Sequence, residues 1–289
     1  MDTILTYVGS KKRFYPIIKD LIPSTTKTYI EPFAGGFSLG IELLENGIVY
    51  EGVLNDLDPN VYNFWLQVKE NPIDLLDAID DLFFRVKKLK TLEDLARYNS
   101  LLQSYNDTPV KLGAQFYIRK KFSRGMTGKN LTEGKLNQIK ESNNFSTSYF
   151  KLTDNILKVS SYLQNFDILN TSYTDLTNYD APNTFWYLDP PYLGATNRNY
   201  YEACKTDDIE TSLHREKALK EFTHNLSGKF LMSNFYAEEL LQQYETHTVR
   251  EIHVPSRMSL GYSREVLIGN YPFELDPMFY MNRLYKIEG

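Results

Sequence analysis

The sequence predicts an α/β protein built on a mostly parallel, twisted sheet. Short apolar runs alternate with amphipathic stretches at both ends of the chain, which is the pattern of strand–helix units. With 289 residues, of which 42 % are hydrophobic, the chain can bury a sizeable core without disulfides or metals. Between residues 70 and 150 the alternation stops. We therefore expect an α/β domain formed by residues 1–69 and 151–289, with residues 70–150 inserted into it.

The expected elements follow from these runs. The candidate strands are Thr28–Glu31, Gly52–Asn55, Phe166–Asn170, Thr184–Leu188, Lys229–Ser233 and Val266–Ile268. The candidate helices are Ser10–Leu21, Ser38–Asn46, Asn60–Lys69 and His214–Leu226. From Leu75 to Tyr105 apolar residues keep a helical spacing without any strand, so we expect the inserted region to be mainly helical.

The net charge of −5 is unevenly distributed. Between Lys111 and Lys140 eight basic residues stand against one acid, so this segment carries +7 and the rest of the chain −12. A basic segment on an acidic body suits a protein that binds nucleic acid at one face, although a solvated surface loop would have the same composition. The candidate nucleic-acid-binding residues are Arg119, Lys120, Lys121, Arg124 and Lys129.

Composition disfavours several other classes of protein. The single cysteine, Cys204, has no second cysteine with which to form a disulfide. We find neither a secretory leader nor an apolar run of membrane-spanning length, and the four histidines lack ligand-like spacing. We therefore expect a cytoplasmic protein with no membrane partner and no metal site.

A glycine-containing turn follows the first candidate strand. Within Tyr29–Ser38 the strand ends at Glu31, and Gly35 and Gly36 precede a helix. Glycines let a ligand approach the backbone closely, and a helix N-terminus offers N–H groups. The spacing to Gly40 does not match the dinucleotide fingerprint G-x-G-x-x-G, so the turn alone does not identify the ligand.

An acid closes the second candidate strand. Asp56 occupies the place where a carboxylate accepts hydrogen bonds from both hydroxyls of a ribose. The alternative role for Asp56 is that of a turn residue or helix N-cap, which Asp58 fits better. Together with the glycine turn, Asp56 indicates a cofactor that contains adenosine.

The most specific signal is Phe185–Tyr192, where an aromatic-rich strand ends in Asp189 and two prolines follow. The prolines fix φ and stiffen the turn. The Asp189 carboxylate and the Pro190 carbonyl would accept hydrogen bonds from a substrate amino group and aim its lone pair at an electrophile. Tyr192 offers a ring face for a planar base. A turn that merely closes the strand is the alternative.

These motifs, in this order, resemble the Dam-type DNA adenine-N6 methyltransferases over residues 7 to 271. The family's motif Asp-Pro-Pro-Tyr is present as Asp189–Tyr192, and Tyr7–Lys12 is similar to its N-terminal cofactor motif. Tyr173–Leu176 is similar to the segment that reads the cofactor's adenine, while Ser233-Asn234 and Arg264–Tyr271 resemble later segments of mainly structural role. The cofactor contacts that the resemblance implies are Tyr7, Lys11, Glu31, Pro32, Phe33, Gly35, Asp56, Asp175 and Leu176.

The resemblance implies a Rossmann-like methyltransferase fold with a mainly helical inserted target-recognition domain. It also implies S-adenosylmethionine as methyl donor and double-stranded DNA as substrate, with Asp189–Tyr192 as the catalytic residues. The methyl group would go to N6 of an adenine flipped out of the duplex. Between Ile118 and Lys129 the chain departs from members that read GATC, because their ending Phe-Asn-x-Pro is absent. Recognition of GATC is therefore not implied.

Other functions are weaker alternatives. Methylation of cytosine N4 or of adenine in RNA is the nearest, and Asp189 and Tyr192 favour adenine. A catalytically silent DNA-binding module would have no chemical need for both the cofactor turn and the Asp-Pro-Pro-Tyr motif. A nicotinamide-dependent oxidoreductase shares the strand–helix pattern, but the glycine spacing and the Pro-Pro turn argue against it.

Overall fold

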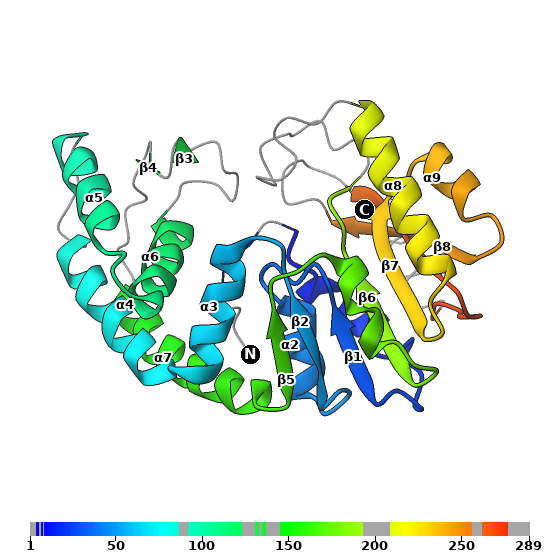
Figure 1. Cartoon of the computed structure of the whole chain (residues 1–289), viewed down its shortest axis with the longest axis horizontal. Coiled ribbons are helices and arrows are strands. Elements are labelled where there is room, and N and C mark those ends of the chain that lie inside the picture. Colours follow the sequence, from blue (N-terminus) through cyan, green and yellow to red (C-terminus); the bar gives the residue numbers. More distant parts are fainter. Residues whose placement is uncertain are drawn as a thin grey trace, which may run out of the picture.

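A computed structural model describes residues 4–5, 7, 9–86, 92–122, 131–132, 135–136, 145–192, 209–255 and 262–276. Its centre is a seven-stranded sheet in the order β5-β2-β1-β6-β7-β9-β8 (Figure 1). The strands are β1 Thr28–Glu31, β2 Glu51–Asn55, β5 Phe166–Leu169, β6 Thr184–Leu188, β7 Lys229–Phe235, β8 Thr248–Pro255 and β9 Tyr262–Gly269. The first five of these run parallel, and β9 pairs antiparallel with both β7 and β8. A separate antiparallel pair joins β3 (Leu131–Thr132) to β4 (Lys135–Leu136).

The helices of the described residues lie between and around these strands. They are η1 Lys12–Phe14, α1 Tyr15–Ile18, α2 Ser38–Glu45, α3 Pro59–Glu70, α4 Pro72–Val86, α5 Leu92–Ser104, α6 Pro109–Phe122, α7 Phe145–Leu163, η3 Tyr173–Tyr179, α8 Ile209–His224 and α9 Glu238–Gln243. The helix expected over Ser10–Leu21 is wrong in extent: a 3-10 turn and one short helix replace it, with Pro16 in the first turn of α1, where a missing N–H is tolerated. In the described part of the chain, no helix has the length and apolar character needed to span a membrane.

All six expected strands are present, with shifted ends for most of them. β8 was not predicted, and its place in the sheet explains why. It is the last strand in the order and pairs only with β9. Thr248 to Glu251 are half-exposed, so charged residues such as Arg250 and Glu251 interrupt the apolar pattern that marks a strand buried on both faces.

Helices cover both faces of the sheet. In β6, Phe185 and Tyr187 belong to one hydrophobic cluster, and Trp186 and Leu188 to the other, because successive side chains point to opposite faces. The first cluster includes residues of α1 to α7, and the second includes residues of η3, α8 and α9. Burial on both faces makes β6 a continuous apolar run, which is why it was recognisable in the sequence.

The region expected as an insertion lies at one end of the molecule. Figure 1 shows α4, α5 and α6 at the end opposite to α8 and α9. α6 packs on α3 and α4, and apolar residues such as Leu75, Ile79 and Ile118 join the same hydrophobic cluster as the strands. The expected boundary at residue 150 falls inside α7, so a continuous helix connects this region to the rest of the chain.

The sheet order creates a crevice beside β1. The chain proceeds from β1 to β2 and β5 on one side, and to β6 and β7 on the other. In open parallel sheets, ligands bind outside the carboxyl ends of the strands where the order reverses in this way. The turns that follow β1 and β6 are therefore neighbours at the place where a ligand is expected.

Candidate active site

A cavity of about 460 Å³ opens at the carboxyl ends of the central strands. Its wall combines the turns that follow four parallel strands with the N-terminal segment. The residues that line it include Tyr7, Lys11, Glu31, Pro32, Phe33, Gly35, Gly36, Asp56, Asp58, Thr171, Asp189 and Pro191. Residues of the turn after β1 and of the turn after β6 thus share one cavity, as expected from the order of the strands.

All the expected cofactor residues except Asp175 and Leu176 lie in this wall as far as the structure describes it. Leu176 is fully buried in the hydrophobic cluster that also holds Trp186 and Leu188. The Asp175 carboxylate is exposed and accepts a hydrogen bond of 2.6 Å from the Thr171 hydroxyl, and Thr171 itself lines the cavity. Asp175 is therefore one side chain removed from the wall.

Gly35 shapes the turn after β1. Its φ of +47° lies in the left-handed region, and a Cβ there would be 2.8 Å from the Tyr7 ring. The Trp65 indole N–H donates to the Gly35 carbonyl at 2.9 Å, and the Gly35 N–H donates to Asp56 Oδ2 at 2.8 Å. A side chain at position 35 would therefore displace Tyr7 from the cavity wall.

The two acids after β2 have different roles. Asp58 caps α3, because its side chain accepts from the Asn60 N–H at 2.8 Å, as the sequence suggested. Asp56 accepts from the Gly35 N–H through Oδ2 and from the Asp58 N–H through Oδ1. Burial raises the pKa of Asp56 to about 6, although both hydrogen bonds oppose the shift. At neutral pH the carboxylate is mostly ionised and retains lone pairs for further donors.

Glu31 is a buried acid at the end of β1. Its side chain is 4 % exposed and accepts a hydrogen bond of 2.7 Å from the Tyr29 hydroxyl. Burial raises the pKa of Glu31 to about 8; the charge of Asp189 adds to the shift, and Tyr29 and Lys11 reduce it. At neutral pH the group is therefore largely protonated in the ligand-free cavity.

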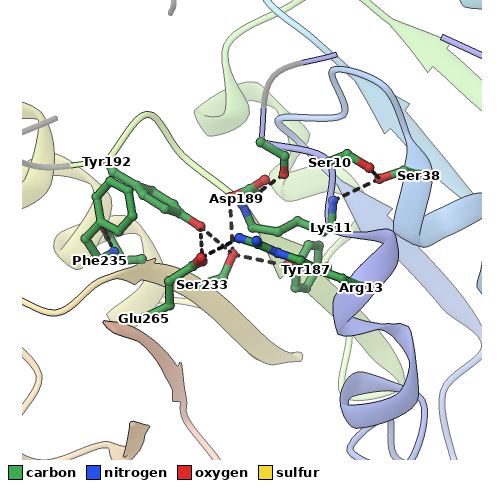
Figure 2. A network of polar contacts seen from close by, with 12 residues as sticks. Ser10, Lys11, Arg13, Ser38, Tyr187, Asp189, Tyr192, Ser233, Phe235 and Glu265 are labelled. Atoms are coloured by element: carbon green, nitrogen blue, oxygen red, sulfur yellow. Dashed lines mark hydrogen bonds and ion pairs between the residues drawn. The ribbon is translucent and has the colours of Figure 1, made fainter. Parts of the chain in front are cut away.

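The turn after β6 holds Asp189 in a fixed position (Figure 2). Lys11 Nζ lies 2.7 Å from Asp189 Oδ1 and also donates to the Gly9 carbonyl at 3.1 Å. The Ser233 hydroxyl donates to the same Oδ1 at 3.2 Å. Among the described residues, none bonds to Oδ2 of Asp189, so this oxygen remains available as an acceptor.

The Tyr192 side chain has contacts at its hydroxyl and on its ring. Its hydroxyl donates to Glu265 Oε2 at 3.1 Å, and Arg13 pairs with Oε1 of the same carboxylate at 2.7 Å. The Lys11 ammonium lies 4.7 Å from the centre of the Tyr192 ring, and the Phe235 ring meets it edge-on at 4.5 Å.

Sequence reasoning assigned no active-site role to Arg13, Ser233, Phe235 or Glu265. Local sequence carries little signal for such contacts: Ser233 and Glu265 lie 44 and 76 positions after Asp189 in the chain. One weak signal existed. Lys11 lies in the N-terminal segment Tyr7–Lys12 and Arg13 directly follows that segment; Lys11 pairs with Asp189 and Arg13 with Glu265.

Three of the expected DNA-binding residues lie in the last turn of α6. Arg119, Lys120 and Lys121 form its last turn, whereas Arg124 and Lys129 lie outside the described residues. Lys120 Nζ lies 4.5 Å from the centre of the Tyr7 ring, and its charge acts on Asp56. The basic end of α6 therefore adjoins the part of the cavity wall formed by Tyr7 and Asp56.

A mostly parallel, Rossmann-like sheet with a cavity at the reversal of strand order is typical of proteins that bind nucleotides or related ligands at that place. The family model of the D12 class N6 adenine-specific DNA methyltransferases matches residues 7–258. The chain belongs to this family and is an N6 adenine-specific DNA methyltransferase. The fold class and the family resemblance expected from the sequence are confirmed.

Known relatives are modification enzymes. The chain is 23 % identical over 282 residues to the type II methyltransferase M1.LlaDCHI of Lactococcus lactis subsp. cremoris, covering 92 % of this chain and 94 % of that protein. It is 24 % identical over 299 residues to the type II methyltransferase M.MjaIII of Methanocaldococcus jannaschii, covering 92 % and 98 %. It is 25 % identical over 283 residues to the modification methylase LlaI of Lactococcus lactis subsp. lactis. That alignment covers 92 % of this chain but only 43 % of the longer relative.

Proposed function

We propose that this chain transfers a methyl group from S-adenosylmethionine to N6 of an adenine flipped out of duplex DNA, and that Asp189–Tyr192 carries the reaction. The observation that supports this best is the meeting of two turns at one cavity. The turn after β1 brings Glu31 and Gly35, and the turn after β6 brings Asp189. The reversal of strand order beside β1 places both turns at the same edge of the sheet.

The cavity suits a positively charged nucleoside cofactor. Burial raises the pKa of Glu31 by more than the Tyr29 hydrogen bond and the Lys11 charge lower it. A further positive charge in the cavity would therefore stabilise the ionised form of Glu31. Asp56, fixed by two backbone N–H groups, has lone pairs left for ribose hydroxyls. S-adenosylmethionine, when bound, supplies a methyl group made electrophilic by a positively charged sulfur. Tyr7 and Phe33 add ring surface to the wall, and Asp175, behind Thr171, remains our candidate acceptor for the cofactor's adenine.

Asp189 orients the target nitrogen. Lys11 and Ser233 hold Oδ1, which leaves Oδ2 and the Pro190 carbonyl as acceptors for the two N6 hydrogens. Two fixed acceptors favour a tetrahedral nitrogen whose lone pair points at the methyl carbon. A bound S-adenosylmethionine would supply the methyl carbon to this nitrogen and would keep the electron pair of its carbon–sulfur bond. The Asp189 charge stabilises the positive nitrogen until it releases one proton to water.

Tyr192 provides the surface for the flipped base. The Lys11 ammonium covers one face of its ring, so a base would stack on the opposite face. The Phe235 ring is 38 % exposed and meets the Tyr192 ring edge-on. Aromatic faces suit a base removed from the stack, because every base has a π surface to cover.

The basic end of α6 is our candidate for the DNA-binding surface, and residues 70–150 for the target-recognition region. Arg119, Lys120 and Lys121 concentrate positive charge in one helical turn. Contact between Lys120 and Tyr7 places this turn beside the cofactor cavity, so DNA held there would lie close to the catalytic turn.

The test is methyl transfer from labelled S-adenosylmethionine to unmethylated duplex DNA by wild type and Asp189→Ala. The variant should lose at least ~10²-fold in rate, because one of two preorganised acceptors is gone. Its affinity for the cofactor, measured by calorimetry, should remain close to that of the wild type. Asp167→Ala is the matched control, since Asp167 is an exposed acid of β5 that binds the Tyr179 hydroxyl and should keep the wild-type rate. Near-wild-type transfer by Asp189→Ala would contradict the assignment.

A further inference from the structure

Glu265 is a buried acid whose two oxygens are both occupied. It lies on β9 opposite Phe235 of β7 and is 1 % exposed. Arg13 Nη2 lies 2.7 Å from Oε1, and the Tyr192 hydroxyl donates to Oε2 at 3.1 Å. A carboxylate is seldom buried unless it is paired and hydrogen-bonded, so the two contacts explain why Glu265 can occupy this position. Each oxygen of Glu265 therefore has its own partner.

The Tyr192 hydroxyl lies between Glu265 and Ser233, the residue that donates to Asp189 (Figure 2). The hydroxyl lies 3.5 Å from Ser233 Oγ, and Ser233 donates to Asp189 Oδ1 at 3.2 Å. The Tyr187 hydroxyl lies 3.0 Å from the same Ser233 oxygen. Burial, followed by the charges of Asp189 and Glu265, raises the pKa of Tyr192, so its hydroxyl keeps the proton that it donates.

The N-terminal segment closes this chain of contacts at both ends. Lys11 pairs with Asp189, and two residues later Arg13 pairs with Glu265. The Lys11–Asp189 pair is largely shielded from water, with side chains 6 % and 13 % exposed, whereas in the second pair Glu265 is 2 % exposed and Arg13 29 %. Three separate parts of the chain thus fix the catalytic turn: the N-terminal segment, β7 and β9.

We propose that Glu265 is a positioning residue for methyl transfer, which holds the Tyr192 hydroxyl so that the ring and Asp189 keep a fixed relation to each other. This inference rests on the proposed function of the Asp189–Tyr192 turn. A tyrosine ring turns about two side-chain bonds, and a hydrogen bond at its far end removes most of that freedom. Orientation matters because a misplacement of about 1 Å can cost ~10²-fold in rate. Arg13 fixes the opposite oxygen and thereby the orientation of the Glu265 carboxylate.

Glu265→Gln removes this hydrogen bond with little change in shape. Arg13 offers only donors and carries a full positive charge, so the amide oxygen of the substituted side chain should face it. The amide nitrogen then faces the Tyr192 hydroxyl, which loses its charged acceptor and can only accept a weaker, neutral hydrogen bond of the opposite direction. Tyr192→Phe removes the same hydrogen bond from the other side and keeps the ring.

The experiment measures single-turnover methyl transfer to duplex DNA by wild type, Glu265→Gln, Tyr192→Phe and the double variant. Each single variant should lose about 10- to 100-fold in rate, with cofactor affinity within about twofold of the wild type. The double variant should be no slower than the slower single variant, because both changes break one interaction. Glu251→Gln is the matched control: Glu251 forms an exposed ion pair with Arg264 in the same strand pair, and its loss should leave the rate unchanged.

Additive losses in the double variant would overturn the inference, since a purely structural role of Glu265 would act independently of the Tyr192 hydroxyl. An unchanged rate for Glu265→Gln in an active enzyme would overturn it as well, while the proposed function would stand. Absence of transfer by the wild type would overturn both. If Glu265→Gln does not fold, Tyr192→Phe decides alone, and a wild-type rate for it would refute the positioning role.

Discussion

The affinity for S-adenosylmethionine should depend on pH through Glu31. Burial raises the pKa of Glu31 to about 8 in the ligand-free protein. If the positively charged cofactor binds to the ionised form, the apparent affinity scales with the ionised fraction, which is about 1/11 at pH 7 and about 1/2 at pH 8. Affinity should therefore rise about fivefold between pH 7 and pH 8. The cost of ionising Glu31 at pH 7 is about 1.4 kcal/mol.

Calorimetric titration of wild type and Glu31→Gln over this range isolates the effect. The cofactor's own amino group titrates nearby, but it does so equally in both proteins. The ratio of the two affinities should therefore change about fivefold between pH 7 and pH 8. S-adenosylhomocysteine lacks the sulfonium charge but keeps the amino group, so its titration shows which of the two cations lies beside Glu31. A ratio that stays constant from pH 7 to pH 8 would refute the reasoning.

The same shift predicts the stability of the ligand-free protein. The pKa of Glu31 is about 8 in the folded protein, against 4.5 for a glutamate side chain in water, so between pH 4.5 and pH 8 the folded state binds more protons than the unfolded state. Stability contributed by this group therefore falls as pH rises from 4.5 to 8 and stays low above 8. Between pH 6 and pH 8 the melting temperature of the wild type should fall relative to that of Glu31→Gln.

Two further predictions concern binding. Asp56→Ala should weaken the binding of S-adenosylmethionine by about 1.5 to 3 kcal/mol, the usual contribution of a hydrogen bond to a charged group. Asp58→Ala should instead lower the free energy of unfolding by ~1 kcal/mol, because α3 loses its N-cap. Equal affinities of wild type and Asp56→Ala in calorimetry would exclude the ribose contact. On α6, Lys121→Ala should flatten the slope of log affinity against log salt by ~0.9 if it binds a phosphate, with cofactor affinity unchanged. Lys120→Ala should also weaken cofactor binding, because Lys120 lies over the Tyr7 ring. DNA binding is measured by fluorescence anisotropy, and identical salt slopes for both variants and wild type would mean that DNA binds elsewhere.

The parts of the fold that the sequence predicted are those with strong local patterns. β1 and β6 are buried on both faces, and their apolar runs were sufficient to find them. The distinction between Asp56 and Asp58 also followed from local rules, because an N-cap has a defined place before its helix. β8, a half-exposed edge strand, has no such pattern.

The contacts of the catalytic turn could not be predicted in the same way. Arg13 and Glu265 are 252 positions apart in the chain and meet only because β9 pairs with β7 beside the N-terminal segment. Similarly, Lys120 was expected to bind DNA from its charge alone, and its contact with Tyr7 depends on how α6 packs on α3. Such contacts depend on tertiary packing, which local residue patterns do not encode.

The most direct test of the account is to identify the base that the enzyme modifies. Unmethylated DNA incubated with the wild-type protein and S-adenosylmethionine, and then read by single-molecule sequencing, should carry N6-methyladenine within one recurring sequence context. The same DNA treated with Asp189→Ala should carry none above background. Modification of cytosine N4, or of no base at all, would contradict the assignment of the Asp189–Tyr192 turn to adenine methylation.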